Sequence, residues 1–249
     1  MPYGPFGKQL YGQTDPDSRG TLFVDPEKLY RIFRTAREKG WQLTAHAQGG
    51  GAVDTLLDVF ERLDKEKPIR NERHHVMHGS FMSEQSLDRM QRLGVSIDMQ
   101  PGWMHLDVPA LQRVFGLENM RWFFPLRSFV DRGIPVAGGT DHMIGFGKND
   151  AVNPYNPFLN IWACVTRKTT EGTVFYPQER VSRETALRMY TNGPAWMQFA
   201  EKQRGSLEVG KYADLVVIDR DILTCPEDDI RAIQPVMTIV NGRIAFEMP

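Results

Sequence analysis

The sequence lacks most of the features that mark a secreted protein. It has only two cysteines among 249 residues, and Cys164 and Cys225 lie far apart with no metal-binding spacing. The pattern therefore indicates neither a disulfide framework nor a cysteine-rich zinc site, and a reduced, cytoplasmic compartment is expected. The first residues also lack the basic start and apolar stretch of a signal peptide, so no targeting segment is expected.

Charge of one sign and long apolar runs are equally scarce. The formal net charge is -1, from 30 basic and 31 acidic residues, which gives no electrostatic footprint for DNA, RNA or an anionic membrane. No apolar run approaches the roughly 18 residues that span a bilayer. With 41% hydrophobic and 24% charged residues, the chain resembles an ordinary globular protein of one large domain or two smaller ones. We therefore expect a small-molecule partner, with no nucleic acid and no membrane.

Strand-like segments alternate with amphipathic helices four times. The strands end at His46, at His78, at Asp98 and at Gly138, and the helical patterns cover 26–39, 53–60, 83–94 and 124–132. This alternation is typical of βα units joined by right-handed crossovers, and therefore of a parallel sheet. A (β/α)₈ barrel needs about 200 to 250 residues for eight units. Because only four units precede Asp141, the pattern predicts an α/β fold that forms half of a TIM-like barrel.

The remainder of the chain changes character. Residues 158–165 and a long stretch from Ser182 to Phe199 have helical patterns, and residues 213–219 have a strand pattern. A hairpin follows, with Asn241-Gly242 at a turn that suits type I′ geometry. We expect residues 1–203 to form a partial barrel with trailing helices, and residues 204–249 to form a β segment of a small second domain.

Three polar residues share the same place in this pattern. His46, His78 and Asp141 each stand at the carboxyl end of a predicted strand, which is where parallel barrels carry their catalytic groups. Neutral imidazole and carboxylate suit zinc and similar divalent ions, which activate water for hydrolysis, and Asp141 would then handle the proton. Each residue alone is more simply a hydrogen-bonded strand-end residue. Together, on three strands, they form a candidate metal site.

Other residues near these strand ends have simpler interpretations. The run Gly49–Gly51 matches no phosphate-binding motif, and we expect backbone crowding to explain it. His75 alternates away from His78 and is expected to pack or to support the site. His105 and His142 are expected in loops near the strand ends, where either could touch substrate. Trp103 could line a pocket, but packing in the core is the simpler interpretation.

Motifs along almost the whole chain, among them His46-Ala47-x-Gly49, Gly139-Thr140-Asp141 and the segment Gly205–Asp219, resemble the metal-dependent amidohydrolase superfamily. More narrowly, they resemble the branch called amidohydrolase family 3, which includes N-substituted formamide deformylases. The most specific motif is the segment Gly205–Asp219, which in this superfamily returns the chain from the barrel to a small β-sandwich. The other matching segments are His46-Ala47-x-Gly49, Arg73 leading to His78-Gly79, Leu93-Gly94-Val95 with Gln100-Pro101, Pro125-x-Arg127-Ser128, Gly139-Thr140-Asp141, Thr166-Arg167 and Ala186-Leu187-x-x-Tyr190-Thr191.

The resemblance assigns roles to the three candidates. His46 would be the metal ligand of barrel strand five, His78 that of strand six, and Asp141 the strand-eight aspartate that binds metal and shuttles protons. The fold would then be the C-terminal half of the barrel, strands 5–8, followed by remnant strands of the β-sandwich. The cofactor would be a divalent metal, zinc above all, with one or two ions in a complete enzyme.

The chain also departs from the family pattern. The His-x-His pair of strand one and the carboxylated lysine or bridging acid of strand four have no counterpart. Gly50 stands where the family often has aspartate, and Thr140 stands where serine is common.

Two hypotheses follow. The first is a metal-dependent hydrolase of non-peptide, amide-like carbon–nitrogen bonds, present as a C-terminal fragment. The second is a catalytically inactive half-barrel that acts as a partner or assembly subunit. In either case the open sheet predicts a homo-oligomer or a separately encoded N-terminal half, because unpaired strand edges invite pairing.

Overall fold

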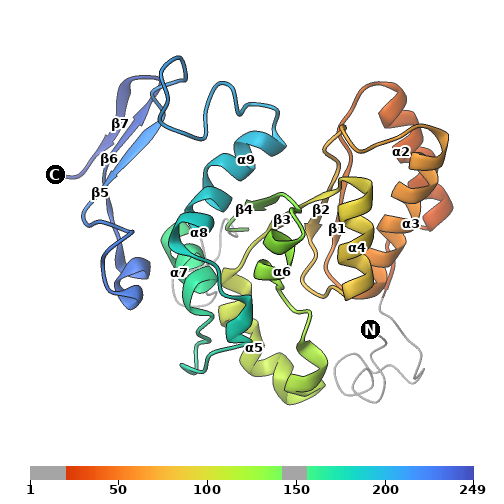
Figure 1. Ribbon diagram of the computed structural model, residues 1–249, viewed down its shortest axis with the longest axis horizontal. Helices are drawn as coiled ribbons and strands as arrows, with labels where there is room; N and C mark the ends of the chain where they lie inside the picture. The colour runs from red at the N-terminus through yellow and green to blue at the C-terminus, as the bar shows by residue number, and fades with distance from the viewer. Residues whose placement is uncertain (1–20, 142–155) are drawn as a thin grey trace. The chain divides into compact units, whose positions relative to one another are not determined.

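The chain divides into two compact units in the computed structural model, which describes residues 21–141 and 156–249 (Figure 1). The first unit comprises Met1–Met99 and Pro109–Pro135, and the second comprises Gln100–Val108 and Val136–Pro249. Among the described residues, no helix is long and apolar enough to cross a membrane.

A parallel sheet forms the centre of the first unit. Its strands pair in the order of the sequence, with Thr44 opposite His75 and His75 opposite Ser96. The strands are β1 (Thr44–Ala47), β2 (His75–His78) and β3 (Ser96–Met99). The predicted parallel pairing of these three segments is therefore confirmed.

Helices connect and cover these strands in the first unit. Asp25 caps the first helix through its carboxylate, and Ser83 forms a reciprocal capping box with Ser86. Gly94 ends its helix with a φ of 70°, where an added Cβ would lie 2.7 Å from the carbonyl oxygen of Arg70. The helices are α2 (Pro26–Glu38), α3 (Gly50–Glu66), α4 (Glu84–Leu93) and α6 (Leu126–Asp131), with the 3₁₀ turn η1 (Leu117–Met120).

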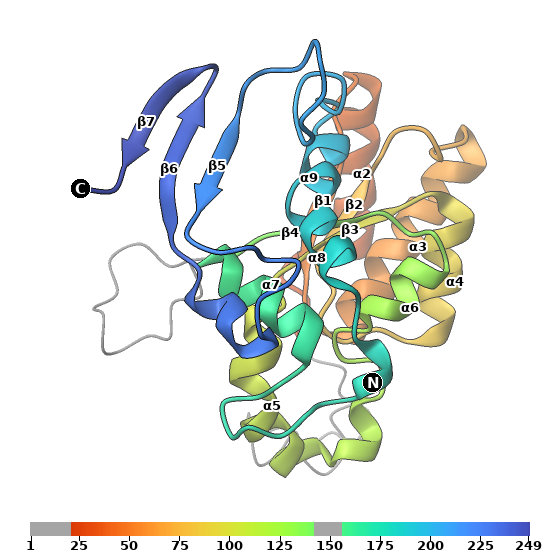
Figure 2. The same cartoon turned by 60° about the vertical axis from the view of Figure 1, so that its left-hand side comes forward.

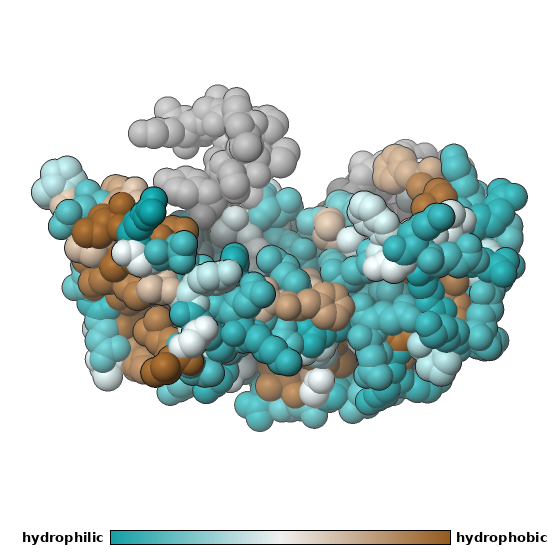
Figure 3. Space-filling model, turned by 90° about the horizontal axis from the view of Figure 1, so that it is seen from above, coloured by the Kyte–Doolittle hydropathy of each residue, from teal (hydrophilic) through white to brown (hydrophobic). Residues whose placement is uncertain are grey.

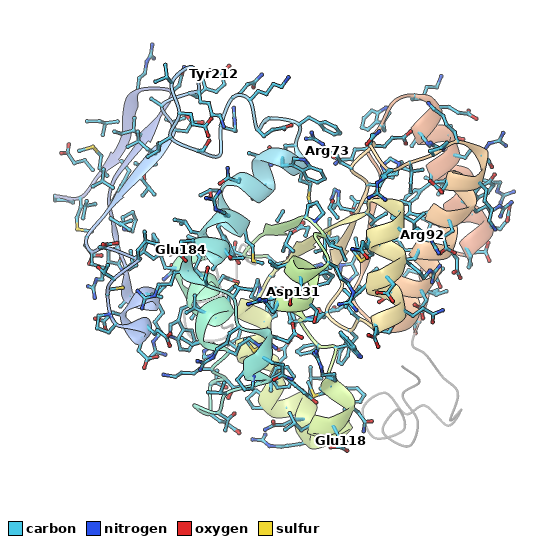
Figure 4. The ribbon with its side chains drawn as sticks, viewed as in Figure 1. Arg73, Arg92, Glu118, Asp131, Glu184 and Tyr212 are labelled. Atoms are coloured by element: carbon cyan, nitrogen blue, oxygen red, sulfur yellow. The ribbon has the colours of Figure 1, made fainter. Side chains whose placement is uncertain are left out.

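The apolar stripe of α3 supplies much of the core of this unit. Its residues Leu56, Leu57 and Phe60 are fully buried, as are Val76 of β2 and Ile97 of β3. The opposite face of the helix layer is charged, and Arg92 of α4 lies on it (Figure 4). The periodicity of the sequence therefore predicted correctly the buried face of α3, whereas Ile32, predicted on the apolar stripe of α2, is 49% exposed.

Helix α5 (Gly102–Phe115) was not predicted, because the stretch between β3 and α6 has Pro109 within it. A proline inside a helix removes a hydrogen bond and disfavours the preceding turn. Met104 and Val108 are nevertheless fully buried, so tertiary packing outweighs the local preference. His105 is consequently helical, and the prediction that it lies in a loop is wrong.

The second unit contains strand β4 (Val136–Gly138) and a set of short helices. The long helix predicted from Ser182 is two helices, since Thr191 has non-helical angles (φ -128°, ψ -76°). The break brings Gly193 so close to β4 that an added Cβ would lie 2.2 Å from the Val136 carbonyl oxygen. The elements are α7 (Pro157–Thr166), α8 (Arg183–Tyr190) and α9 (Asn192–Met197), with 3₁₀ turns η2 (Pro177–Glu179) and η3 (Glu227–Ala232).

An antiparallel meander completes the second unit (Figure 2). It consists of β5 (Leu215–Ile218), β6 (Pro235–Val240) and β7 (Arg243–Glu247), paired in that order. Asn241 and Gly242 have φ values of 49° and 75°, which confirms the predicted hairpin turn. The boundary between residues 203 and 204 and the assignment to a half-barrel stay predictions.

Candidate metal site

The rings of His46 and His78 lie against each other, with centroids 4.4 Å apart and planes at 69°. His46 is an exposed residue of β1, whereas His78 ends β2 and is 7% exposed. Two of the three predicted ligands thus come from neighbouring strands and meet at their carboxyl ends.

The backbone of His78 explains how these two rings meet. The register places Ala47, not His46, opposite His78, so a regular alternation would send the two imidazoles to opposite faces. His78, however, has a left-handed φ of 71°, and this ends the extended conformation and redirects the side chain. A non-glycine residue in this region costs free energy, and such residues concentrate at functional sites.

Gly79 continues the same turn with a φ of 53°. An added Cβ there would lie 2.5 Å from Cδ1 of Ile97, so any other residue requires the Ile97 side chain to shift. The His78-Gly79 motif therefore has a steric reason in this chain, independent of any resemblance.

Asp141 follows β4 in the second unit and also has a positive φ, 50°. Nε1 of Trp103 donates a hydrogen bond to its Oδ2 at 3.1 Å. The prediction that Trp103 packs in the core missed this role, because helix α5 that presents it was not predicted. A tryptophan indole has only one donor, and here that donor is directed at the candidate carboxylate.

Tyr190 of α8 holds the backbone just before Asp141. Its hydroxyl donates to the carbonyl oxygen of Gly139 at 3.0 Å, and its ring packs on Gly138. A Cβ at Gly138 would lie 2.4 Å from Cε2 of that ring. Gly138 thus allows α8 to approach the end of β4.

The described residues bring only part of a metal site together. His46 and His78 adjoin within the first unit, and Asp141 belongs to the second, so its approach to the histidines stays a prediction. No group of three or more His, Cys, Asp or Glu in the ranges 21–141 and 156–249 is arranged to hold a metal ion. Two adjoining imidazoles do fit a divalent ion as part of its ligand set. His142 lies outside the described residues.

A cavity of about 540 Å³ opens beside His46. Ala45, His46, Ala47 and Gln48 all line it, and consecutive strand residues point to alternate faces. The cavity therefore faces the backbone edge of β1 rather than one face of the sheet. Its other walls are mainly apolar, and they include Leu22, Phe23, Leu29, Ala52 and Leu56.

The glycine run after His46 serves the start of α3. Gly49 is the residue before this helix, and an added Cβ there would meet nothing within 4 Å. The prediction that backbone crowding explains this glycine run is therefore wrong for Gly49.

A buried polar network lies at the other end of β2. Nδ1 of His74 accepts the backbone N–H of Leu43 at 3.2 Å, and its Nε2 lies 3.0 Å from Oε2 of Glu72. Arg37 donates to both oxygens of Glu72 at 2.7 and 2.8 Å. Burial is the main cause that lowers the pKa of His74 to about 4. Burial also lowers the pKa of His75, which agrees with the packing role predicted for it.

The fold and this geometry define a class: an α/β protein whose adjacent parallel strands carry two adjoining imidazoles at their carboxyl ends. The sequence profile of the amidohydrolase family matches residues 6–246. The chain therefore belongs to the amidohydrolase family, in the branch called amidohydrolase family 3, as its motifs predicted.

Individual relatives agree with this membership. The chain is 29% identical over 239 residues to YtcJ of Bacillus subtilis, covering 94% of this chain and 43% of YtcJ. It is 30% identical over 233 residues to N-substituted formamide deformylase of Arthrobacter pascens, covering 92% and 41%. An uncharacterized metal-dependent hydrolase from Pyrococcus horikoshii has a similar structure, with a TM-score of 0.71 and 27% identity over 86% of this chain and 41% of that one. The chain thus spans less than half the length of these proteins.

Proposed function

We propose that this chain carries part of the active site of a metal-dependent hydrolase that cleaves non-peptide carbon–nitrogen bonds in amide-like small molecules. The observation that carries the proposal is the contact between His46 and His78 at the ends of two adjacent parallel strands. Membership of the amidohydrolase family and the similarity to a formamide deformylase support this class of reaction.

In this proposal His46 and His78 hold a divalent ion through ring nitrogens, and zinc is the ion that best suits imidazole ligands together with a carboxylate. The ion would supply Lewis acidity toward the amide carbonyl and toward water. The strained backbone at His78 fixes one imidazole in place, so little reorganisation is needed when the ion binds.

Asp141 is assigned the proton transfers. It accepts a proton from water as the new carbon–oxygen bond forms, and it donates that proton to the departing nitrogen as the carbon–nitrogen bond breaks. The hydrogen bond from Trp103 to Oδ2 fixes the plane of the carboxylate during both transfers. The overall reaction consumes one water molecule and releases an acid and an amine.

We further propose that the chain corresponds to strands 5–8 of the barrel and to remnant strands of the β-sandwich. The share of its relatives that it spans supports this, as does the cavity beside β1, which among the described residues pairs with β2 alone. The remaining ligands would then come from barrel strands 1–4, of which strand four would pair with β1.

Cobalt(II), a spectroscopic substitute for zinc, tests the metal-ligand assignment directly. We expect absorption bands of imidazole-ligated cobalt when the chain is titrated, and their loss in the double variant His46→Ala/His78→Ala. His75→Gln is the matched control, because His75 lies on the same strand but outside the ring pair. Identical spectra for the double variant and the unmodified chain would refute the assignment.

The second candidate function is an inactive half-barrel that acts as an assembly subunit. The observation that favours it is the absence of a three-ligand cluster among residues 21–141 and 156–249, together with the open β1 edge. The two candidate functions predict different activities for a complex of this chain with an N-terminal half. If a complex with an N-terminal half forms but shows no metal-dependent hydrolysis, the assembly role is favoured.

A further inference from the structure

Exposed apolar side chains gather on the β5–β7 sheet of the second unit, which is the brown area at the left of Figure 3. Val216, Ile244 and Phe246 are 50%, 58% and 45% exposed. In the proposed β-sandwich, the other strands would cover this area, so it is not an independent ligand site. A polar cavity elsewhere in the same unit has no such explanation.

The polar cavity has a volume of about 410 Å³ and lies between α5, the end of α7 and η3. His105 of α5 lines it, two residues after Trp103. Since a helix turns by about 100° per residue, these two side chains point roughly 200° apart, and Trp103 is directed at Asp141. The cavity is therefore separate from the candidate metal site. The other charged and aromatic residues of its wall are Trp162, Lys168, Asp228 and Arg231.

Two of the three charges in this wall cancel. Nζ of Lys168 donates to both carboxylate oxygens of Asp228 at 2.7 and 2.6 Å, and Nε1 of Trp162 donates to Oδ1 at 3.1 Å. The hydrogen bond from Lys168, followed by that from Trp162, lowers the pKa of Asp228, so this carboxylate is ionised. An ammonium group has three N–H donors, and Lys168 therefore keeps one for a ligand.

The charge of Arg231 is not cancelled. The ion pairs nearby are Lys168–Asp228 and Arg220–Asp229, and Arg231 takes part in no ion pair that the described residues form. Its guanidinium carbon lies 4.8 Å from the centroid of the Trp162 ring, a cation–π contact that holds the group in place. The wall of the cavity thus carries one net positive charge.

His105 contributes a hydrogen-bond acceptor to the cavity. Its ring is 9% exposed, and Nδ1 lies 2.8 Å from the carbonyl oxygen of Lys168. A carbonyl oxygen only accepts, so Nδ1 carries the hydrogen, and Nε2 of the neutral ring is an acceptor. Burial lowers the pKa of His105, and the charge of Arg231 acts in the same direction, which keeps the ring neutral.

We propose that this cavity binds a small monocarboxylate that carries a hydroxyl group next to the carboxylate. The guanidinium fork of Arg231 matches the two carboxylate oxygens, the third N–H of Lys168 donates to one of them, and Nε2 of His105 accepts from the hydroxyl. A monoanion balances the single uncancelled charge, whereas a phosphate dianion would be repelled more strongly by Asp228. The site does not depend on the proposed hydrolase activity.

NMR of the tryptophan indoles in the full 249-residue chain tests this site, with glycolate as the probe. The indole N–H of Trp162 donates to Asp228 in the cavity wall, and that of Trp103 donates to Asp141 outside it. We expect sodium glycolate, titrated against sodium chloride at equal ionic strength, to shift the Trp162 resonance saturably and to leave that of Trp103 in place. Trp162→Phe assigns the resonance. Acetate, which lacks the hydroxyl, should bind about fivefold more weakly.

Two variants separate the contributions of the wall. Arg231→Gln should weaken glycolate binding by about tenfold or more, and His105→Phe should make glycolate and acetate bind equally. Arg188→Gln is the matched control, because it removes one positive charge from an exposed residue of α8 that does not line the cavity. It should leave the affinity unchanged. An unchanged Trp103 resonance in each variant shows that the second unit folds alike.

Three results would overturn the proposal. The first is the absence of a saturable shift of the Trp162 resonance with glycolate in the unmodified chain. The second is an equal affinity for glycolate in Arg231→Gln, which would assign the shift to another surface. The third is tighter binding of inorganic phosphate than of glycolate, which would replace the monocarboxylate with a dianion.

Discussion

The indole of Trp103 donates a hydrogen bond of 3.1 Å to the carboxylate of Asp141, across 38 residues of sequence. Trp103 stands in the first turn of α5, and Asp141 follows β4. The contact joins two elements of the second unit at the residue assigned to proton transfer. It also gives that carboxylate a fixed orientation that the sequence motif alone does not explain.

Replacing the indole donor should therefore weaken the second unit and loosen Asp141. Trp103→Phe keeps an aromatic ring but removes the N–H, and a hydrogen bond of this kind contributes about 1 kcal/mol. We expect a decrease of about that size in the free energy of unfolding, measured by urea denaturation with a probe in the second unit. Trp41→Phe is the control, because Trp41 is 70% exposed and lies in the first unit. Equal stability of the two variants would show that the contact contributes nothing.

Zinc should bind the isolated chain weakly. Catalytic zinc sites use three protein ligands, and the described residues bring two imidazoles together. We expect less than one equivalent of zinc per chain after dialysis, and the fraction that remains should fall further in His46→Ala. Metal analysis of the dialysed protein measures both. A full equivalent retained with nanomolar affinity would contradict the assignment of an incomplete site.

The sequence predicted correctly that His46 and His78 lie near the ends of neighbouring strands and come together, but it did not predict the means by which they meet, and their role as metal ligands stays a prediction. The strand pattern placed His46 and His78 at strand ends, because period-two alternation and the glycines that follow are local signals. The left-handed φ of His78 and the close approach of Gly79 to Ile97 have no counterpart in the local sequence pattern. Helix α5 was not predicted for a similar reason. The burial of Met104 and Val108 in the folded chain outweighs the local preference of Pro109 against a helix.

Hydrolysis by the isolated chain should stay at background. N-formyl amines and simple amides with added zinc are the substrates to use, since a similar protein is an N-substituted formamide deformylase. The reason is physical: an incomplete ligand set does not fix the ion, and supporting residues change metal affinity or activity by about 10- to 100-fold. Robust turnover that is lost in Asp141→Ala, but kept in the surface control Asp131→Ala, would show that the chain is active by itself.

Gly79→Ala should destabilise the first unit more than Gly40→Ala. Both glycines have a positive φ, 53° and 78°, which costs an alanine about 1–2 kcal/mol. Only at Gly79 does the new Cβ also collide, 2.5 Å from Ile97 Cδ1, and overpacking adds about 1–3 kcal/mol. Urea denaturation followed in the first unit gives the two values. Equal losses of stability in the two variants would show that the Ile97 side chain of β3 moves away from the added methyl group with no loss of free energy.

His74 should make the first unit less stable in mild acid. Its side chain is 1% exposed, and burial lowers its pKa to about 4 from an ordinary value of 6.5. The carboxylate of Glu72, 3.0 Å away, acts in the opposite direction but does not prevail. The pKa of Glu72 itself is lowered. Burial acts to raise this pKa, but the hydrogen bonds and the positive charge of Arg37 outweigh the effect of burial.

The sign of the pH dependence follows from proton uptake. Between pH 6.5 and pH 4 the unfolded chain protonates this imidazole while the folded chain keeps it neutral, so unfolding takes up a proton and acid favours it. The stability from this group is fully present above pH 6.5 and is lost as the pH falls through that window, by an amount on the order of 3 kcal/mol. NMR titration of the His74 ring should give the low pKa directly. In His74→Gln, the loss of stability between pH 7.5 and pH 5 should be smaller than in the unmodified chain. The stability of the variant at pH 7.5 is the reference value, because it already includes any packing lost through the substitution. An unchanged pH dependence would show that His74 titrates normally and that other groups cause the acid sensitivity.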